Sequence, residues 1–204
     1  MSNNPVENVQ TPVGTLEWVF ITGKGKKDLQ DNDRFVAAVV FPTDSDECKI
    51  LEEQIKEFWE ENKPKGAKLK SLGITALKDE NDALTGRTSF NFWTGTEFPD
   101  GSAKIIKVFT AKGNEVSLGS KKIGNGSRGR IKGAMGIYDQ GPAARGVTLY
   151  LNGIQLSKFI PFDGGVDFDE MEGEEDGFDG FEDDGMGALA PESESENPAP
   201  QPRL

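Results

Sequence analysis

Alternating hydrophobic and polar residues predict two strands near the start of the chain. Residues 15–22 alternate with a period of two, which is typical of a strand whose two faces are both partly covered. One face of this strand would carry Leu16, Trp18 and Phe20, and the other Glu17, Val19 and Ile21. Residues 34–42 form a continuous apolar run that ends at a proline, which indicates a buried strand.

The pattern changes to a helical period over residues 45–62. Acidic residues crowd the first turn, where they favour a helix N-terminus. Thr43, Asp44 or Ser45 can cap this helix, and Pro64 ends it. We predict an amphipathic helix that packs on the rest of the fold through Cys48, Leu51, Ile55, Phe58 and Trp59.

Strand patterns return over residues 88–95, 103–113, 127–139 and 146–162. A Pro-Asp-Gly turn signal separates the first two, which are predicted to form a hairpin. Glycines within the last two indicate bulges or strong coiling, which closed barrels need. These patterns predict a mainly β fold, a small antiparallel barrel of roughly five to seven strands with one main helix and long basic loops.

The net charge of −12 hides three unlike regions. The net charge is −6 over residues 1–100, +8 over 101–162 and −14 over 163–204. The last region has no helical or strand period and is rich in Gly, Pro and Ser, so we expect it to be disordered. We therefore divide the chain into a flexible N-terminus (1–13), a barrel domain (14–162) and a disordered acidic tail (163–204).

The tail carries aromatic residues among its acids, namely Phe168, Phe178 and Phe181. A purely solvating tail gains nothing from exposed phenylalanines, whereas a docking segment needs an apolar anchor and charge for steering. We interpret the tail as a docking segment for a protein partner. A solubilising appendage is the alternative.

The residue inventory excludes familiar catalytic sites. The chain has no histidine and one cysteine, Cys48, so a Cys/His zinc site and an internal disulfide are excluded. Gly124, Gly126 and Gly129 spell G-x-G-x-x-G, but no helical pattern follows, and Leu149 stands where a dinucleotide site needs an acid. We predict no enzyme, no metal and no cofactor. The lone cysteine fits a reducing cytosol, and no apolar run approaches the ~18 residues of a membrane span.

Basic and aromatic residues share faces of the predicted strands. A protein that binds single strands needs a positive groove for phosphates and exposed rings for base stacking. The candidates are Trp93, Lys107, Phe109, Lys121, Lys122, Arg128, Arg130, Lys132, Tyr138 and Tyr150. For Trp93, Phe109 and Tyr138 the alternative is a second core layer under the helix, and for the cations it is a solvated surface.

Three segments, residues 89–113, 119–139 and 146–162, together with the acidic tail, resemble phage-encoded single-stranded DNA-binding proteins of the OB-fold type. The residues that carry most of the resemblance are IGNGS (123–127) and GVTLYLNGIQL (146–156). The resemblance implies an OB-fold that coats exposed strands during phage DNA replication and recombination, in the cytoplasm of the infected bacterium. It also implies a tail that engages phage or host replication proteins and competes with DNA for the groove.

The sequence departs from that family in two respects. The last aromatic residue is Phe181, whereas such proteins often end on the acidic-aromatic motif. The predicted helix also follows the second strand, whereas an OB-fold usually places it between the third and fourth. An inserted helix or an extra N-terminal strand would explain this position.

Two other functions fit the same pattern. One is a phage interaction or scaffold protein whose basic face docks an acidic tail. The other is an RNA-binding barrel of the cold-shock type. A homodimer is compatible with all three functions, and the sequence specifies neither the oligomeric state nor the tail's partner.

Overall fold

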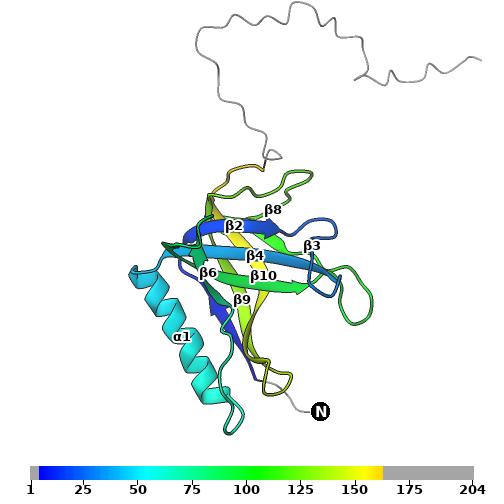
Figure 1. Cartoon of the computed structure of the whole chain (residues 1–204). Helices are drawn as coiled ribbons and strands as arrows, with labels where there is room; N and C mark the ends of the chain where they lie inside the picture. Colours follow the sequence, from blue (N-terminus) through cyan, green and yellow to red (C-terminus); the bar gives the residue numbers. More distant parts are fainter. Residues whose placement is uncertain (1–4, 163–204) are drawn as a thin grey trace, which may run out of the picture. The chain divides into compact units, whose positions relative to one another are not determined.

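The structure is a computed structural model that describes residues 5–162, and this part of the chain is mainly β (Figure 1). The predicted tail, residues 163–204, lies outside the described residues. The elements are, in chain order, β1 (Val6–Gln10), β2 (Gly14–Phe20), β3 (Lys26–Lys27), β4 (Asp33–Pro42), α1 (Asp46–Asn62), β5 (Ile74–Lys78), β6 (Leu84–Gly95), β7 (Lys107–Thr110), β8 (Glu115–Val116), β9 (Ser127–Asp139) and β10 (Arg145–Lys158).

Five of the strands close into a barrel. The order β9-β2-β4-β6-β10 returns to β9 through a long antiparallel pairing between β9 and β10. Most neighbours are antiparallel, but β10 runs parallel to β6, with Leu149 beside Phe92 and Tyr150 beside Trp93. A five-stranded barrel with one main helix is the OB-fold architecture, so the predicted fold class is confirmed.

The barrel core is built from the apolar faces that the sequence predicts in β9 and β10. Ile131, Met135, Val147 and Leu149 are all buried in it. Gly133 allows these strands to approach closely, because a Cβ there would lie 2.1 Å from the Tyr150 carbonyl oxygen. A register shift follows on β10 between Leu151 and Gly153, so the bulge expected from the glycines is present.

Helix α1 is confirmed within a residue of its predicted bounds. The Ser45 hydroxyl caps it by accepting a hydrogen bond from the Cys48 backbone N–H at 3.2 Å. The buried side of α1, which includes Cys48 and Trp59, packs against β4, β9 and β10 (Figure 1). Because α1 follows β4, it lies between the second and third barrel strands, which makes it an inserted helix.

The predicted flexible N-terminus over residues 1–13 is wrong for its described part. Val6–Gln10 forms β1, which pairs antiparallel with β9 on the outside of the barrel closure. Val9 is buried, and the hydroxyl of Thr11 accepts a hydrogen bond from the Ile131 N–H at 3.0 Å. Ladder bonds and one buried side chain order this segment although its sequence is mostly polar.

The predicted hairpin between residues 88–95 and 103–113 is also wrong. The corresponding strands, β6 and β7, each pair in parallel with β10, and one isolated bridge, Glu97–Ala103, joins the ends of the connection between them. The Pro-Asp-Gly signal does make a local turn, since the Gly101 N–H donates to the Phe98 carbonyl oxygen at 2.9 Å. The turn lies inside a longer loop and so does not set the strand pairing.

The faces of β2 differ from the prediction as well. Leu16, Val19 and Ile21 are buried in the core, whereas Trp18 and Phe20 are exposed. A register shift between Glu17 and Phe20 interrupts the period of two. One extra residue in a strand moves the following side chains to the opposite face, which explains the difference.

Candidate nucleic-acid interface

Two grooves meet on the outer face of the barrel. The first groove, about 630 Å³, crosses β2, β4 and β6 and is mainly apolar, with Trp18, Leu29, Val36 and Leu77 in its lining. The second groove, about 580 Å³, crosses β6, β10 and β9 and is rich in amides and hydroxyls. Both share Arg34, Asn91 and Trp93, so together they make one continuous track.

Trp93 lies where the two grooves join. The guanidinium carbon of Arg34 lies 4.1 Å from the centroid of its ring, close enough for a cation–π contact. The ring of Tyr150 meets it edge-on, with the centroids 5.8 Å apart and the planes at 61°. Gly136 makes room for Tyr150, because a Cβ there would lie 2.7 Å from the tyrosine ring. The result is a half-buried cluster of two rings and one cation on the outer face.

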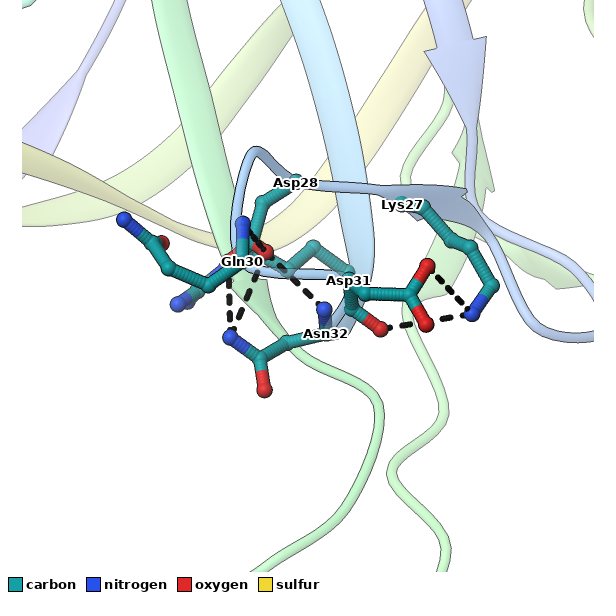
Figure 2. Close-up of polar contacts among 6 residues, drawn as sticks. Lys27, Asp28, Gln30, Asp31 and Asn32 are labelled. Carbon is teal, nitrogen blue, oxygen red and sulfur yellow. Dashed lines mark hydrogen bonds and ion pairs between the residues drawn. The ribbon is translucent and has the colours of Figure 1, made fainter.

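The loop before β4 holds Arg34 in place. Figure 2 shows the polar contacts within this loop. One carboxylate oxygen of Asp28 accepts the backbone N–H groups of Gln30 and Asn32, each at 2.9 Å. The other accepts a hydrogen bond from Nε of Arg34. The Arg34 bond, followed by those from the loop, holds the pKa of Asp28 well below its usual range. Asp28 therefore stays ionised and ties the loop to the arginine.

A third groove, about 360 Å³, collects the predicted residues Lys107, Phe109, Arg130 and Lys132. It runs over β7, β10 and β9. Nε of Arg130 donates to the Gln155 side-chain oxygen at 2.7 Å, and the Gln155 amide donates to the Thr110 carbonyl oxygen at 2.9 Å. Nζ of Lys107 lies 2.9 Å from a carboxylate oxygen of Glu115.

A shallow depression connects the aromatic cluster to the third groove. Its lining includes Tyr150, which also borders the second groove, and Asn152, which also borders the third. Tyr150 is half-buried and Asn152 is exposed, whereas Leu151 between them is buried, so both residues point outward from the barrel. The second groove, this depression and the third groove therefore form a continuous path for an extended polymer, from Trp93 over β10 to Lys132.

Other predicted residues have separate positions. Tyr138 lies in the second groove. Lys121, Lys122 and Arg128 do not line any of these grooves. Nζ of Lys122 lies 6.0 Å from the ring centroid of Phe162, the last described residue. Phe168, Phe178 and Phe181 are outside the described residues.

The loop from 121 to 127 is held by backbone bonds. The Gly124 N–H donates to the Ile160 carbonyl oxygen at 2.8 Å, and the Gly126 N–H donates to the Leu16 carbonyl oxygen at 3.1 Å. Gly124 itself is packed closely, since a Cβ there would lie 2.8 Å from the Pro161 carbonyl oxygen. Gly124 thus allows this loop to approach the segment that follows β10 closely.

Sequence reasoning missed Arg34, Trp18 and Asn91. Arg34 begins an apolar run, so the run was assigned to a buried strand, although Arg34, Val36 and Ala38 alternate on the outer face of β4. Within residues 5–162, no group of three or more His, Cys, Asp or Glu side chains could hold a metal ion. The polar part of the groove lining is made mainly of cations, amides and hydroxyls, beside aromatic rings and aliphatic side chains.

The fold is similar to solved structures of phage proteins. One is gp2.5, a single-stranded DNA-binding protein encoded by bacteriophage T7, with a TM-score of 0.55 and 20% identity over 79% of this chain and 98% of that one. A second is the C-terminally truncated single-stranded DNA-binding protein of bacteriophage Enc34, with a TM-score of 0.55 and 12% identity over 76% of this chain and 88% of that one. A third is the Enc34 protein in complex with single-stranded DNA, with a TM-score of 0.54 and 14% identity over 76% of this chain and 89% of that one.

No protein-family model and no curated protein sequence matches the chain. The likeness is thus one of structure, and it extends over nearly the whole length of the T7 protein. The chain has the fold of phage single-stranded DNA-binding proteins, as its sequence resemblance implies.

Proposed function

We propose that this protein binds single-stranded DNA without strong sequence preference and carries out no catalytic step. The observation that carries the proposal is the cluster at the junction of the two grooves, where Arg34 lies over Trp93 and Tyr150 meets its edge. A base that stacks on an aromatic side chain contributes about 1–3 kcal/mol, and every base has such a face. Paired bases are stacked on each other inside a duplex, so this surface favours unpaired strands.

The third groove complements the aromatic cluster. Arg130, Lys132 and Lys107 supply positive charge for phosphates beside the ring of Phe109. The amides and hydroxyls of the second groove can donate to or accept from any base edge, which suits a sequence-tolerant protein. Bases would occupy the first two grooves and the backbone would continue over β10 to the third.

We further propose that the protein acts in phage DNA replication or recombination, in the cytoplasm of the infected bacterium. The phage origin of the similar structures supports this role. No helix within the described part of the chain is long and apolar enough to cross a membrane. The tail would recruit phage or host replication proteins through its phenylalanines, and a homodimer is compatible with this arrangement.

The tail would also compete with DNA, because it carries a net charge of −14. Truncation after Phe162 should tighten binding to a single strand at low salt. The measurement is a titration of full-length and truncated chains with the same oligonucleotide. Equal or weaker binding by the truncated chain would reject competition by the tail while leaving DNA binding intact.

The proposed function is tested by titrating the protein with ~30-nucleotide dT, a matched duplex and a matched RNA. We expect tryptophan quenching and tighter binding to dT than to duplex, with Trp93→Ala weakening binding several-fold or more. Ile50→Ala is the matched control, because Ile50 is an exposed apolar residue on α1 and lines none of the grooves. Tighter binding to RNA would favour the cold-shock-like function, and salt-sensitive oligomers without DNA binding would favour the scaffold.

A further inference from the structure

The bulge in β2 centres on a strained residue. Trp18 has a φ of 49°, in the left-handed region that a residue with a Cβ rarely adopts. The register of β2 against β4 shifts between Glu17 and Phe20, on either side of it. Such strain persists only where surrounding contacts hold it, and it concentrates at binding and catalytic sites.

The bulge changes which way the indole points. With an uninterrupted period of two, Trp18 would share the inward face of Leu16. In the bulged strand, Leu16 and Val19 are both buried, and Trp18 is 42% exposed. The strand thus accepts a strained backbone and places a large aromatic ring outside the barrel, where a substantial part of its surface remains exposed to solvent.

Asn125 holds the bulge from a distant part of the chain. Its side-chain oxygen accepts a hydrogen bond from the Trp18 backbone N–H at 2.8 Å. The next residue, Gly126, has a φ of 87° and donates its N–H to the Leu16 carbonyl oxygen at 3.1 Å. These two bonds clamp the loop 123–127 onto β2 on both sides of Glu17, so the glycine-rich motif supports Trp18.

The exposed ring borders the first groove. Trp18 and Trp93 both line this groove. Val36 on β4 pairs with Phe20 of β2 on one side and with Trp93 of β6 on the other, so β4 lies between the strands of the two tryptophans. Their strands are two inter-strand steps apart, roughly 10 Å. Leu29, at the tip of the loop before β4, is fully exposed at the same groove. The first groove therefore has an aromatic residue on each side and an apolar tip above it.

We propose that Trp18 is a second stacking surface for an unpaired base, and that Asn125 is a positioning residue that fixes it there. This inference rests on the proposed function and names a further contact of the same interface. A base in the first groove would lie between the two rings, with Trp18 on one side of it and Trp93 on the other. The same strand can then continue through the cluster at Trp93 into the second groove.

The test first measures the affinity of the full chain for dT in Trp18→Ala, Asn125→Ala, the double variant and Trp93→Ala. Trp18→Ala should weaken binding ~5- to 150-fold, the range for one lost stacked base. Asn125→Ala should weaken it less, and should have no further effect once Trp18 is removed. Asn125→Asp, which keeps the acceptor oxygen, should restore most of the affinity at high salt, where its added charge is screened.

Fluorescence separates a stacking role from a structural one. In a Trp93→Phe variant the remaining tryptophans are Trp18 and Trp59, and Trp59 is 2% exposed. Quenching of this variant by dT therefore reports on Trp18, whether or not Trp18→Ala folds. Trp18→Phe, which keeps an aromatic face, should retain most of the affinity.

The outcomes distinguish the two proposals. If Trp93→Ala weakens binding while Trp18→Ala does not, and dT leaves Trp93→Phe unquenched, the role of Trp18 is overturned and the proposed function stands. If Asn125→Ala weakens binding equally with and without Trp18, the positioning role of Asn125 is overturned. If the unmodified chain does not bind dT at low salt, both proposals fail.

Discussion

Lys132 offers the most direct test of a phosphate path over β10. It lines the third groove between β1 and β10, with Gln10 and Gly153 as its register partners. Its ammonium has no side-chain partner among residues 5–162, whereas Lys107 is paired with Glu115. Lys132 can therefore bind a phosphate without first breaking an ion pair, so Lys132→Gln removes one contact and little else.

The size of the effect follows from counterion release. Each phosphate neutralised on a single strand contributes ~0.7 to the slope of log affinity against log salt. Lys132→Gln should make this slope shallower by about 0.7, and the triple variant with Lys107→Gln and Arg130→Gln by about 2. When salt rises from 50 to 200 mM, the affinity of Lys132→Gln for dT should therefore fall by a factor roughly 2.5 times smaller than that of wild type.

The assay is a series of dT titrations at four or more salt concentrations. Lys56→Gln is the matched control, since it makes the same charge change on α1, where Lys56 is paired with Glu52 at 2.6 Å. Trp93→Ala should lower affinity at every salt concentration and leave the slope unchanged, because stacking releases no counterions. A slope that Lys132→Gln leaves unchanged, or that Lys56→Gln alters equally, would refute the phosphate path.

Three further predictions concern stability. Trp18→Gly should be more stable than Trp18→Ala by roughly 0.5–1 kcal/mol in urea unfolding, because glycine adopts the positive φ of this position without strain; equal stabilities would argue against strain. Gly133→Ala should lower the free energy of unfolding by roughly 1–3 kcal/mol, because its Cβ would meet the Tyr150 carbonyl oxygen. Gly95→Ala is the control: the nearest atom to its Cβ is 3.6 Å away, so the loss of stability should be less than half as large. Asp28→Asn should lower the free energy of unfolding at pH 7, because the lowered pKa of Asp28 stabilises the fold only while the carboxyl is ionised. The difference in unfolding free energy from wild type should therefore shrink as the pH falls below about 4, the ordinary aspartate pKa. A difference that stays constant down to pH 2 would contradict this.

Much of the fold follows from local patterns. The helical spacing from Cys48 to Trp59 and the alternation along β9 and β10 depend on short-range periodicity, and the structure confirms them. Barrel closure and the parallel pairing of β10 with β6 and β7 depend on contacts between distant segments. The predicted hairpin failed for that reason, because a turn signal fixes a local bend and not the partner of a strand.

The candidate site divides in the same way. Trp93 and Tyr150 are predicted as site residues from the less apolar faces of their strands, and the pairing of these strands makes them neighbours. Trp18 could not be placed, because no glycine marks its bulge and the bond that holds it comes from a residue 107 positions away. The sequence groups Lys121 and Lys122 with Lys132, but in the structure neither lines the third groove, and Lys122 lies near the Phe162 ring instead.

The measurement that tests the central claim most directly is tryptophan fluorescence of the full-length protein during titration with dT and with a duplex of equal length. The account predicts quenching and tight binding with dT and weaker binding with the duplex. Trp93→Ala should bind dT more weakly and lose the part of the quenching that comes from Trp93, while Ile50→Ala behaves as wild type. Equal affinity for duplex and single strand, or quenching that Trp93→Ala leaves intact, would contradict it.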